Sequence, residues 1–334
     1  MADDVPGFDL ERFGAWLTEA IPGAGGEVVA SVIAGGKSNL TYDVTDGAGR
    51  WIVRRPPLGH VLATAHDMGR EYRVMSALQG SAVPVPRMLA FCSDEEVLGA
   101  PFYVMERIDG QAFTKASELD ALGAARTRAI SMRTVDTLAD LHAVVPDAVG
   151  LGDFGRPEGF LGRQVERWRK QLDASRTRDL PAADELYRRL AADVPPDGAA
   201  GIVHGDYRLD NLLIDAEDRP AAVIDWEMAT LGDPLTDLAL MLVYGRMAGT
   251  GVVTDANLAE GYLSEAETIE RYASRSDRDL SRFGFYLGLA SFKLVGILEG
   301  IHYRYQHGQT VGPGFDRIGG LVDPLVRTGL DALD

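Results

Sequence analysis

Two aspartates and an asparagine stand in two neighbouring polar loops in the second half of the chain. Asp206 and Asn211 form the pattern D-x-x-x-x-N, and Asp225 follows fourteen residues after the asparagine. Between them, the apolar runs 212–215 and 221–225 are separated by turn-forming residues, which predicts a hairpin of two strands. The hairpin would bring both loops to one cleft. Two carboxylates and an amide suit Mg²⁺ there, because this cation takes hard oxygen ligands and shares them with phosphates.

These residue types and spacings resemble the catalytic loop of protein kinases, H-R-D-x-x-x-x-N, followed by a later metal-binding aspartate. The HGD opening and the IDWE continuation are closer to the aminoglycoside phosphotransferase family of small-molecule kinases. The resemblance implies that Asp206 takes the proton of an acceptor hydroxyl and that Asn211 and Asp225 hold Mg²⁺. A surface hairpin with polar turns is the simpler alternative, but it leaves the full set of types and spacings unexplained.

Length and composition describe an ordinary globular protein. The 334 residues are 46% hydrophobic and 25% charged, which allows a large core and predicts two lobes or domains. The net charge of −17 argues against nucleic acid or an anionic membrane as a main partner. Cys92 is the only cysteine, so an internal disulfide is excluded and a reducing compartment is the natural expectation.

The sequence also gives an expectation about location. The N-terminal residues are acidic and lack the basic and apolar regions of a signal peptide. The longest apolar stretches, such as 238–244, are too short to span a bilayer. We therefore expect a cytoplasmic protein, and the oligomeric state is left open.

The first part of the chain predicts strands joined by glycine-rich turns, at 28–33, 40–45 and 51–54. The loop before the second strand could present backbone N–H groups around Gly36 and the hydroxyl of Ser38 to the phosphates of ATP. Two glycines before a strand are more often only a hairpin. The loop gains weight from its place upstream of the catalytic segment.

Arg54 is the candidate phosphate ligand on the third strand, where kinases carry a lysine. Arginine is always charged and can bind phosphate through two nitrogens, so the role is chemically sound. Arg55 is the neighbouring candidate, but strand alternation sends it to the opposite face. A helix predicted over 67–79 offers Glu71 as the partner of Arg54. The alternative is that Glu71 pairs locally with an exposed arginine such as Arg70.

A hinge is expected after two further strands, 88–92 and 102–105. After this last strand the polarity of the sequence rises from Glu106 onward, and Gly110 prevents the strand from continuing. In a kinase fold adenine would bond to backbone groups of about Glu106 to Ile108, and their side chains carry little information.

The rest of the chain predicts a helical lobe, with helices at 117–144, 160–175, 182–193, 255–274, 278–305 and 315–331. His142 is expected to be a packed, hydrogen-bonded histidine, and His204 to brace the loop. By resemblance, Asp237 bonds the backbone of the catalytic loop. The fold class is therefore α+β: a bilobal protein-kinase-like fold. A small antiparallel β-rich N-lobe at 1–108 would bind nucleotide, and a mostly helical C-lobe at 109–334 would hold the catalytic loop and acceptor site.

The acceptor is the hardest part to predict. The stretches GGKSNLTY, HGDYRLDNLL and SFKLVGILEGIHYRYQHGQ resemble the kinase domain fused to acyl-CoA dehydrogenases, which phosphorylates hydroxylated fatty-acyl substrates. We thus expect an ATP- and Mg²⁺-dependent phosphotransferase acting on a small hydroxyl compound such as a hydroxyacyl-CoA or hydroxy acid. The apolar segment 283–304, with Glu299 as its only acid, favours this over a polycationic sugar. An aminoglycoside kinase and a non-catalytic nucleotide-binding protein are the alternatives.

Overall fold

The computed structural model describes residues 5–33, 39–59, 67–310 and 314–334. The chain forms two compact units, each built from two separate segments. Unit 1 is Met1–Gln111 with Leu213–Ala229, and unit 2 is Ala112–Leu212 with Thr230–Asp334. The α+β prediction is confirmed, because unit 1 carries an antiparallel sheet and unit 2 is mostly helical.

Unit 1 is built on a five-stranded antiparallel sheet with the order β1-β2-β3-β5-β4. The strands are β1 (Val29–Val32), β2 (Leu40–Thr45), β3 (Arg50–Arg55), β4 (Met88–Cys92) and β5 (Phe102–Glu106). In the register of the sheet, Arg54 of β3 lies opposite Thr41 on one side and Tyr103 on the other. The central strand β3 therefore places Arg54 between two paired strands, β2 and β5.

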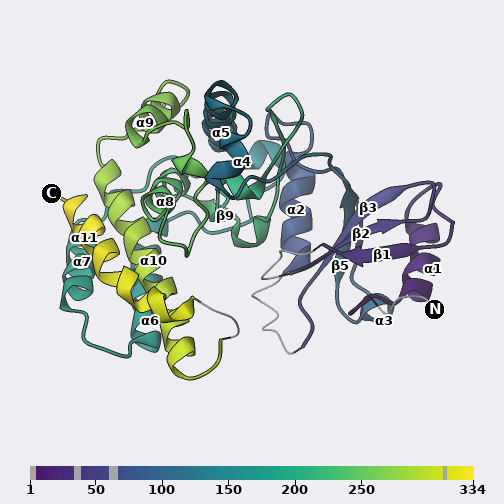
Figure 1. Cartoon of the computed structure of the whole chain (residues 1–334), viewed down its shortest axis with the longest axis horizontal. Coiled ribbons are helices and arrows are strands. Elements are labelled where there is room, and N and C mark those ends of the chain that lie inside the picture. The colour runs from purple at the N-terminus through teal and green to yellow at the C-terminus, as the bar shows by residue number, and fades with distance from the viewer. Residues whose placement is uncertain (1–4, 34–38, 60–66, 311–313) are drawn as a thin grey trace. The chain divides into compact units, whose positions relative to one another are not determined.

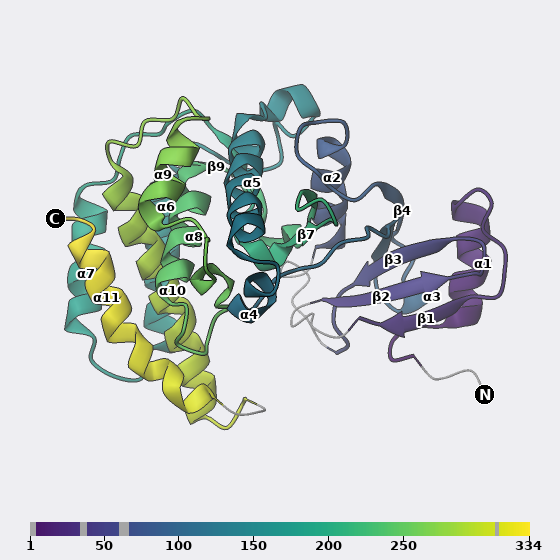
Figure 2. The same ribbon diagram turned by 45° about the horizontal axis from the view of Figure 1, so that its top comes forward.

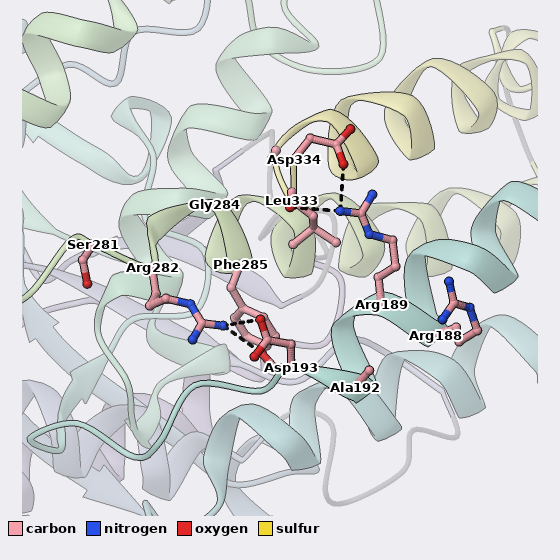
Figure 3. A pocket seen from close by; sticks show the side chains of 11 residues that line it. Arg188, Arg189, Ala192, Asp193, Ser281, Arg282, Gly284, Phe285, Leu333 and Asp334 are labelled. Atoms are coloured by element: carbon pink, nitrogen blue, oxygen red, sulfur yellow. Dashed lines mark hydrogen bonds and ion pairs between the residues drawn. The ribbon is translucent and has the colours of Figure 1, made fainter.

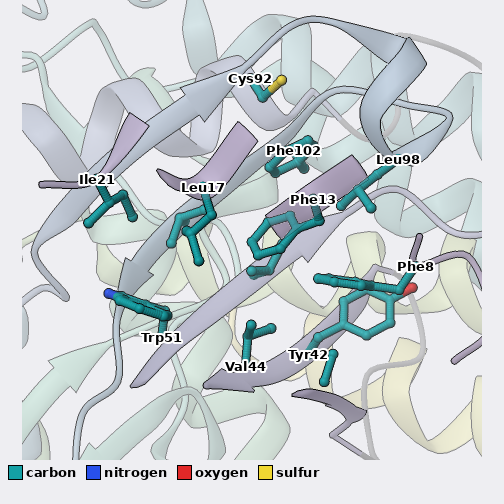
Figure 4. Close-up of a cluster of buried hydrophobic side chains, with 13 residues drawn as sticks. Phe8, Phe13, Leu17, Ile21, Tyr42, Val44, Trp51, Cys92, Leu98 and Phe102 are labelled. Atoms are coloured by element: carbon teal, nitrogen blue, oxygen red, sulfur yellow. The ribbon is translucent and has the colours of Figure 1, made fainter. Parts of the chain in front are cut away.

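A cluster of buried hydrophobic side chains covers one face of this sheet (Figure 4). Helix α1 (Leu10–Ala20) begins after Asp9, whose side chain accepts from the N–H of Arg12, and buries Phe13 and Leu17. Phe13 lies 5.7 Å from Phe102 between ring centroids. The cluster occupies the face away from Arg54, because neighbouring strand residues point to opposite faces.

Helix α2 and the predicted hairpin complete unit 1, together with the short helix α3 (Glu95–Leu98). Helix α2 (Met68–Leu78) starts after Asp67, which accepts from the N–H of Arg70, and buries Glu71. The hairpin strands are β7 (Leu212–Ile214) and β8 (Pro220–Val223).

The hairpin is tied to unit 1 by backbone hydrogen bonds. Gln111 and Ile214 exchange two bonds of 2.9 Å, and the N–H of Val223 donates to Pro84 at 2.8 Å. The sequence instead assigned every residue after 108 to one C-terminal lobe. Turn-forming residues identify a hairpin, but they do not show which distant backbone it bonds to. The membership of the hairpin in unit 1 therefore could not be predicted from the sequence. Which ligand each lobe binds stays a prediction.

Unit 2 is mainly α-helical. Its helices are α4 (Ala116–Asp120), α5 (Ala124–Ala143), α6 (Phe160–Ser175), α7 (Pro181–Ala192), α8 (Leu235–Arg246), α9 (Glu265–Ala273), α10 (Phe283–Gln306) and α11 (Val322–Asp331). Two short antiparallel strands, β6 (Gly201–Val203) and β9 (Thr230–Gly232), flank the segment 204–229. Short 3₁₀ turns are η1 (Pro146–Val149), η2 (Leu209–Asn211), η3 (Trp226–Met228), η4 (Ala256–Leu258) and η5 (Phe315–Leu321), of which η3 belongs to unit 1.

Two predicted helices differ from the structure. The helix expected at 117–144 is broken at Gly123, whose φ of +88° is a conformation that other residues rarely adopt. The helix expected at 255–274 is formed only from Glu265, where Ser264 and Glu267 make a capping box. In both cases a local signal, a glycine or a capping box, sets the end of the helix although the apolar pattern continues across it.

Helix α10 is the centre of unit 2 and packs against α6, α8 and α11 (Figures 1 and 2). Among the described residues it is the one helix long and apolar enough to cross a membrane, but 78% of its most apolar window is buried inside the fold. The expectation that the longest apolar stretches are as short as 238–244 is therefore wrong for α10. The burial identifies α10 as a core helix, which explains why it is apolar all round.

Candidate active site

Arg54 joins two acidic side chains in unit 1. Its Nη1 lies 3.3 Å from Glu71 Oε2, and its Nη2 donates to Asp225 Oδ1. The side chain of Arg54 is nearly buried and that of Glu71 is fully buried. Burial alone would lower the pKa of Arg54, but the neighbouring Tyr103, Glu71 and Asp225 raise it above its usual value. The predicted pairing with Glu71 is present, and the guanidinium is fixed beside Asp225.

Arg55 points the other way, as strand alternation requires. Its Nη1 donates to the carbonyls of Gly7 and Leu98 at 2.8 and 2.6 Å. Arg55 therefore ties the N-terminal segment to the sheet, and Arg54 is the arginine on the α2 side.

Glu71 receives two further hydrogen bonds inside unit 1. Asn39 Nδ2 donates to Oε1 at 3.1 Å, and the hydroxyl of Tyr103 donates to Oε2 at 2.9 Å. Burial raises the pKa of Glu71 to about 7, although Arg54 and the Tyr103 hydrogen bond act to lower it. Asn39 also donates to Glu227 Oε2 at 3.1 Å. One asparagine thus links the helix α2 acid to the segment that follows the hairpin.

Asp225 has a left-handed backbone, with φ 67° and ψ 59°. A non-glycine residue in this region costs about 1 kcal/mol or more and persists where its surroundings fix it. Here Trp226 Nε1 donates to the carbonyl of Val223 at 3.0 Å, and the Trp226 ring is buried. The strained turn directs the Asp225 carboxylate toward Arg54.

Asp206 and Asn211 face each other across the catalytic loop of unit 2. Asn211 Nδ2 donates to the backbone carbonyl of Asp206 at 2.8 Å and to its Oδ2 at 3.3 Å. The N–H of Asp206 donates to His204 Nδ1 at 3.3 Å, so His204 braces the loop. Because Nδ2 makes both bonds of Asn211, its amide oxygen is directed away from Asp206 and is a hard oxygen of the kind that Mg²⁺ binds.

Asp237 of α8 holds the backbone of this loop. Its two carboxylate oxygens accept the N–H of His204 at 2.6 Å and that of Gly205 at 2.8 Å. His142 Nε2 lies 3.4 Å from Asp237 Oδ2, and its Nδ1 lies 2.8 Å from the hydroxyl of Tyr272. Burial lowers the pKa of His142. The predicted support role of Asp237 and the packed state of His142 are both present in the structure.

Two side chains frame the carboxylate of Asp206. Arg208 Nε lies 3.5 Å from Asp206 Oδ1, and Arg208 Nη2 lies 3.0 Å from Asp210 Oδ2. The guanidinium stacks over the ring of Tyr244 at 4.6 Å. Burial raises the pKa of Tyr244, whose hydroxyl also hydrogen-bonds Asp206. A cation and a phenol therefore stand next to the predicted base.

All six predicted nucleotide contacts stay predictions, including those of Arg54 and Glu71. Gly36 and Ser38 lie outside the described residues. Glu106 ends β5, and its N–H already donates to the carbonyl of Arg87 at 2.9 Å. Ile108 lies two residues beyond the strand and is half-buried.

The predicted metal ligands come from different units. Asp225 lies in unit 1 and Asn211 in unit 2. Within the described part of the chain, no three or more His, Cys, Asp or Glu side chains form a group that could hold a metal ion. Each of the two residues by itself offers a hard oxygen of the kind that Mg²⁺ binds together with phosphate oxygens and water.

A pocket of about 440 Å³ lies between the end of α7 and the start of α10 (Figure 3). Its cations already contact acids: Arg282 Nη2 lies 2.6 Å from Asp193 Oδ2, and Arg189 Nη2 lies 2.8 Å from Asp334 Oδ1. Arg188 contacts an acidic neighbour on α7. None of the predicted site residues lines this pocket, so it carries no part of the predicted chemistry.

Several residues that contact the predicted site residues were not predicted from the sequence: Asn39, Tyr103, Glu227, Tyr244 and Lys293. Tyr103 could have been found from the pairing of β3 with β5, because it lies opposite Arg54 in that antiparallel register. Tyr244 and Lys293 reach the catalytic loop from α8 and α10, and helical periodicity does not show which neighbours a helix meets.

A family model described as the phosphotransferase enzyme family, APH, matches residues 29–275. The chain belongs to this family. The match covers most of both units, including β3, α2, the catalytic loop and the hairpin. It confirms the family that the HGD and IDWE motifs indicated.

Curated relatives of this phosphotransferase are longer proteins. It is 34% identical over 334 residues to acyl-CoA dehydrogenase family member 11 of Homo sapiens, covering 97% of this chain and 43% of the relative. It is 32% identical over 303 residues to acyl-CoA dehydrogenase family member 10 of Mus musculus, covering 89% and 28%. The chain thus spans less than half the length of these relatives.

Solved structures share the fold of the phosphotransferase. A Ralstonia eutropha JMP134 protein, provisionally described as an aminoglycoside phosphotransferase, matches with a TM-score of 0.86 and 34% identity, over 98% of both chains. APH(4)-Ia in complex with ADP and hygromycin B matches with a TM-score of 0.62 and 18% identity, over 95% of this chain and 98% of that one. The second likeness shows the fold alone.

Proposed function

We propose that this phosphotransferase moves the γ-phosphoryl group of ATP to a hydroxyl group of a small molecule. The observation that carries the proposal is the cluster of Arg54, Glu71 and Asp225. It presents a fixed guanidinium next to a hard carboxylate, which suits a phosphate group with its metal ion. The ADP complex of the structural relative APH(4)-Ia supports a nucleotide as the phosphoryl donor.

The residues would divide the work between phosphate and acceptor. Arg54 would bind the α- and β-phosphates, while Glu71 keeps its guanidinium in place. Asp225 and Asn211 would provide oxygen ligands for Mg²⁺. When bound, this ion would bridge phosphate oxygens and neutralise part of their charge. Asp206, held by Asn211, would orient the acceptor hydroxyl and accept its proton.

We further propose that the acceptor is a hydroxyacyl thioester or small hydroxy acid. Arg208 lies 3.5 Å from Asp206, where it would repel a cationic acceptor and attract an anionic one. A pocket of about 230 Å³ in unit 2 is lined by α5, α8 and α9. Among the described residues that line it, Glu265 is the only acid, and it is paired with Arg246. A polycationic sugar needs several free carboxylates, because each desolvated ammonium must be paired.

Glu299 supplies no such carboxylate either. It is fully buried in α10, and Arg178 Nε donates to its Oε1 at 3.0 Å. The relatives named as acyl-CoA dehydrogenase family members agree with an acyl substrate.

An acceptor panel tests this choice. Wild-type protein with ATP and Mg²⁺ is assayed for ADP release with 3-hydroxybutyryl-CoA, 4-hydroxybutyryl-CoA, glycerol and kanamycin A. We expect the highest kcat/KM for a hydroxyacyl-CoA. A preference for kanamycin A would replace the acceptor class, whereas no turnover with any acceptor would favour a non-catalytic nucleotide-binding protein.

Asp225→Ala tests the metal role independently of the acceptor. We expect the variant to lose Mg²⁺-dependent ATP binding, since a hard oxygen ligand is missing, while circular dichroism stays unchanged. Calorimetric titration with ATP, with and without Mg²⁺, measures the effect. The matched control is Asp218→Ala, which also removes an aspartate with positive φ, on the hairpin turn. Equal metal dependence in wild type and Asp225→Ala would remove Asp225 from the site.

A further inference from the structure

Lys293 of α10 contacts the backbone of the loop that carries Asp206. Its ammonium group donates to the backbone carbonyl of Gly205 at 2.8 Å and lies 5.5 Å from the centre of the Trp168 ring. Burial lowers the pKa of Lys293, while Asp206 and Asp237 act to raise it. This lysine therefore brings a charge into the fold at the residue just before the predicted base.

The carbonyl that Lys293 holds belongs to the peptide group joining Gly205 to Asp206. The other end of the same planar group, the N–H of Asp206, donates to His204 Nδ1 at 3.3 Å. A peptide group is rigid, so two contacts at its opposite ends fix its orientation. The preceding peptide group is held by Asp237, which accepts the N–H of Gly205 at 2.8 Å. Lys293 thus completes the set of contacts that orients Asp206.

Packing alone does not explain a lysine at this place. Methionine would fill the same space beside Trp168 without the cost of removing an ammonium group from water. A charged donor gains more from a buried carbonyl than a neutral one does. Gly205 has a φ of +87°. Because glycine has no Cβ and can adopt many backbone conformations, contacts from neighbouring groups are needed to fix its backbone.

We propose that Lys293 is a positioning residue that holds the Gly205–Asp206 peptide group and so aims the Asp206 carboxylate at the acceptor hydroxyl. The inference rests on the proposed function for its kinetic consequence. Its structural part, a loop fixed from α10, stands on the contacts of unit 2. Lys293 acts through Asp206 and need not touch the substrate.

The variants are Lys293→Met, Lys293→Gln and Lys293→Arg, with Lys170→Met as the control. Lys170 is an exposed lysine on α6, so its replacement matches the chemical change without touching the loop. Each protein is assayed with ATP, Mg²⁺ and the acceptor that gives the highest wild-type rate among 3-hydroxybutyryl-CoA, glycerol and kanamycin A. Hydrogen–deuterium exchange of the segment 202–212 is followed by mass spectrometry in the same proteins.

We expect Lys293→Met to lower kcat by roughly 10- to 100-fold, the scale of a misplaced catalytic group. KM for ATP should stay within about twofold, because Lys293 belongs to the acceptor half of the site. Exchange in 202–212 should become faster by roughly tenfold, the scale of one lost hydrogen bond. Lys293→Arg should recover part of kcat, and Lys170→Met should match wild type in every readout.

A kcat for Lys293→Met within twofold of wild type would overturn the proposal, and so would a rise in KM for ATP with kcat unchanged. Should the Met variant fail to fold, Lys293→Gln is judged by the same limits. If wild type phosphorylates none of the three acceptors, the proposed function fails, and the exchange measurement still decides the role of Lys293. Unchanged exchange of 202–212 in the variant would then refute it.

Discussion

Arg54 binds two carboxylates at once through separate nitrogens of one guanidinium group. A lysine at this position, as in most kinases, would offer a single point charge that can contact Glu71 or Asp225 but cannot span both in the same way. The sequence predicted the pairing with Glu71 from the order of strand and helix. It did not predict that Asp225 would share the arginine, because that contact depends on the left-handed turn after the hairpin.

Arg54→Lys should therefore be a damaging substitution in spite of its retained charge. We expect kcat/KM for ATP to fall by roughly tenfold or more, the worth of one charge-assisted hydrogen bond. Steady-state kinetics with varied ATP measures it. Arg50→Lys is the matched control, since Arg50 lies on the same strand but is exposed and pairs with Asp43. Equal losses in the two variants would show that the bridging geometry is unimportant.

Glu71 makes the stability of unit 1 depend on pH. Its folded pKa of about 7 lies above the ordinary value of 4.5, so between these pH values the folded state binds one proton more than the unfolded state. Stability should fall as pH rises through this window, by roughly 1 kcal/mol per pH unit. Glu71→Gln should lack this component.

Urea unfolding of wild type and Glu71→Gln at pH 5, 6 and 7 measures the difference between them, in which other titrating groups cancel. We expect wild type to lose stability relative to the variant as the pH increases. A constant difference over the three pH values would contradict the raised pKa.

At the scale of elements, strands and helices with clear ends were predictable. Strand β2 and helix α6 have the predicted limits because turn residues or a glycine bound their apolar patterns. The break between α4 and α5 was missed, because one glycine in a long helical pattern is usually tolerated. Helix α10 was expected to begin at 278 and begins at Phe283, since an apolar pattern does not mark an uncapped start.

Gly123→Ala tests the cause of the break. The backbone of Gly123 has φ 88° and ψ 155°, and a Cβ there would meet open space. The cost should therefore come from backbone strain alone, and we expect a loss of about 1–2 kcal/mol in the free energy of unfolding. Gly162→Ala, on helix α6 and also facing open space, should stabilise by up to about 1 kcal/mol. Chemical denaturation compares the two, and effects of the same sign would contradict the explanation.

At the scale of the whole molecule, each unit carries part of the predicted chemistry. Asp225 and Arg54 belong to unit 1, Asp206 and Asn211 to unit 2, and the chain passes between the units more than once. Spacing along the sequence predicted the loop with Asp206 and Asn211 and the later aspartate Asp225. It could not reveal the partners that arrive from distant elements, such as Asn39, Tyr244 and Lys293, because their neighbours are set by packing.

The most direct test of the account is ³¹P NMR of wild-type protein with ATP, Mg²⁺ and a hydroxyacyl-CoA. We predict that the γ-phosphate signal of ATP is replaced by equal amounts of ADP and a new phosphomonoester. Asp206→Asn should slow this conversion by roughly 10²- to 10⁴-fold, the usual effect of a positioned base. Release of inorganic phosphate without a phosphomonoester, or an equal rate in Asp206→Asn, would contradict the assignment of Asp206 as the base for a hydroxyl acceptor.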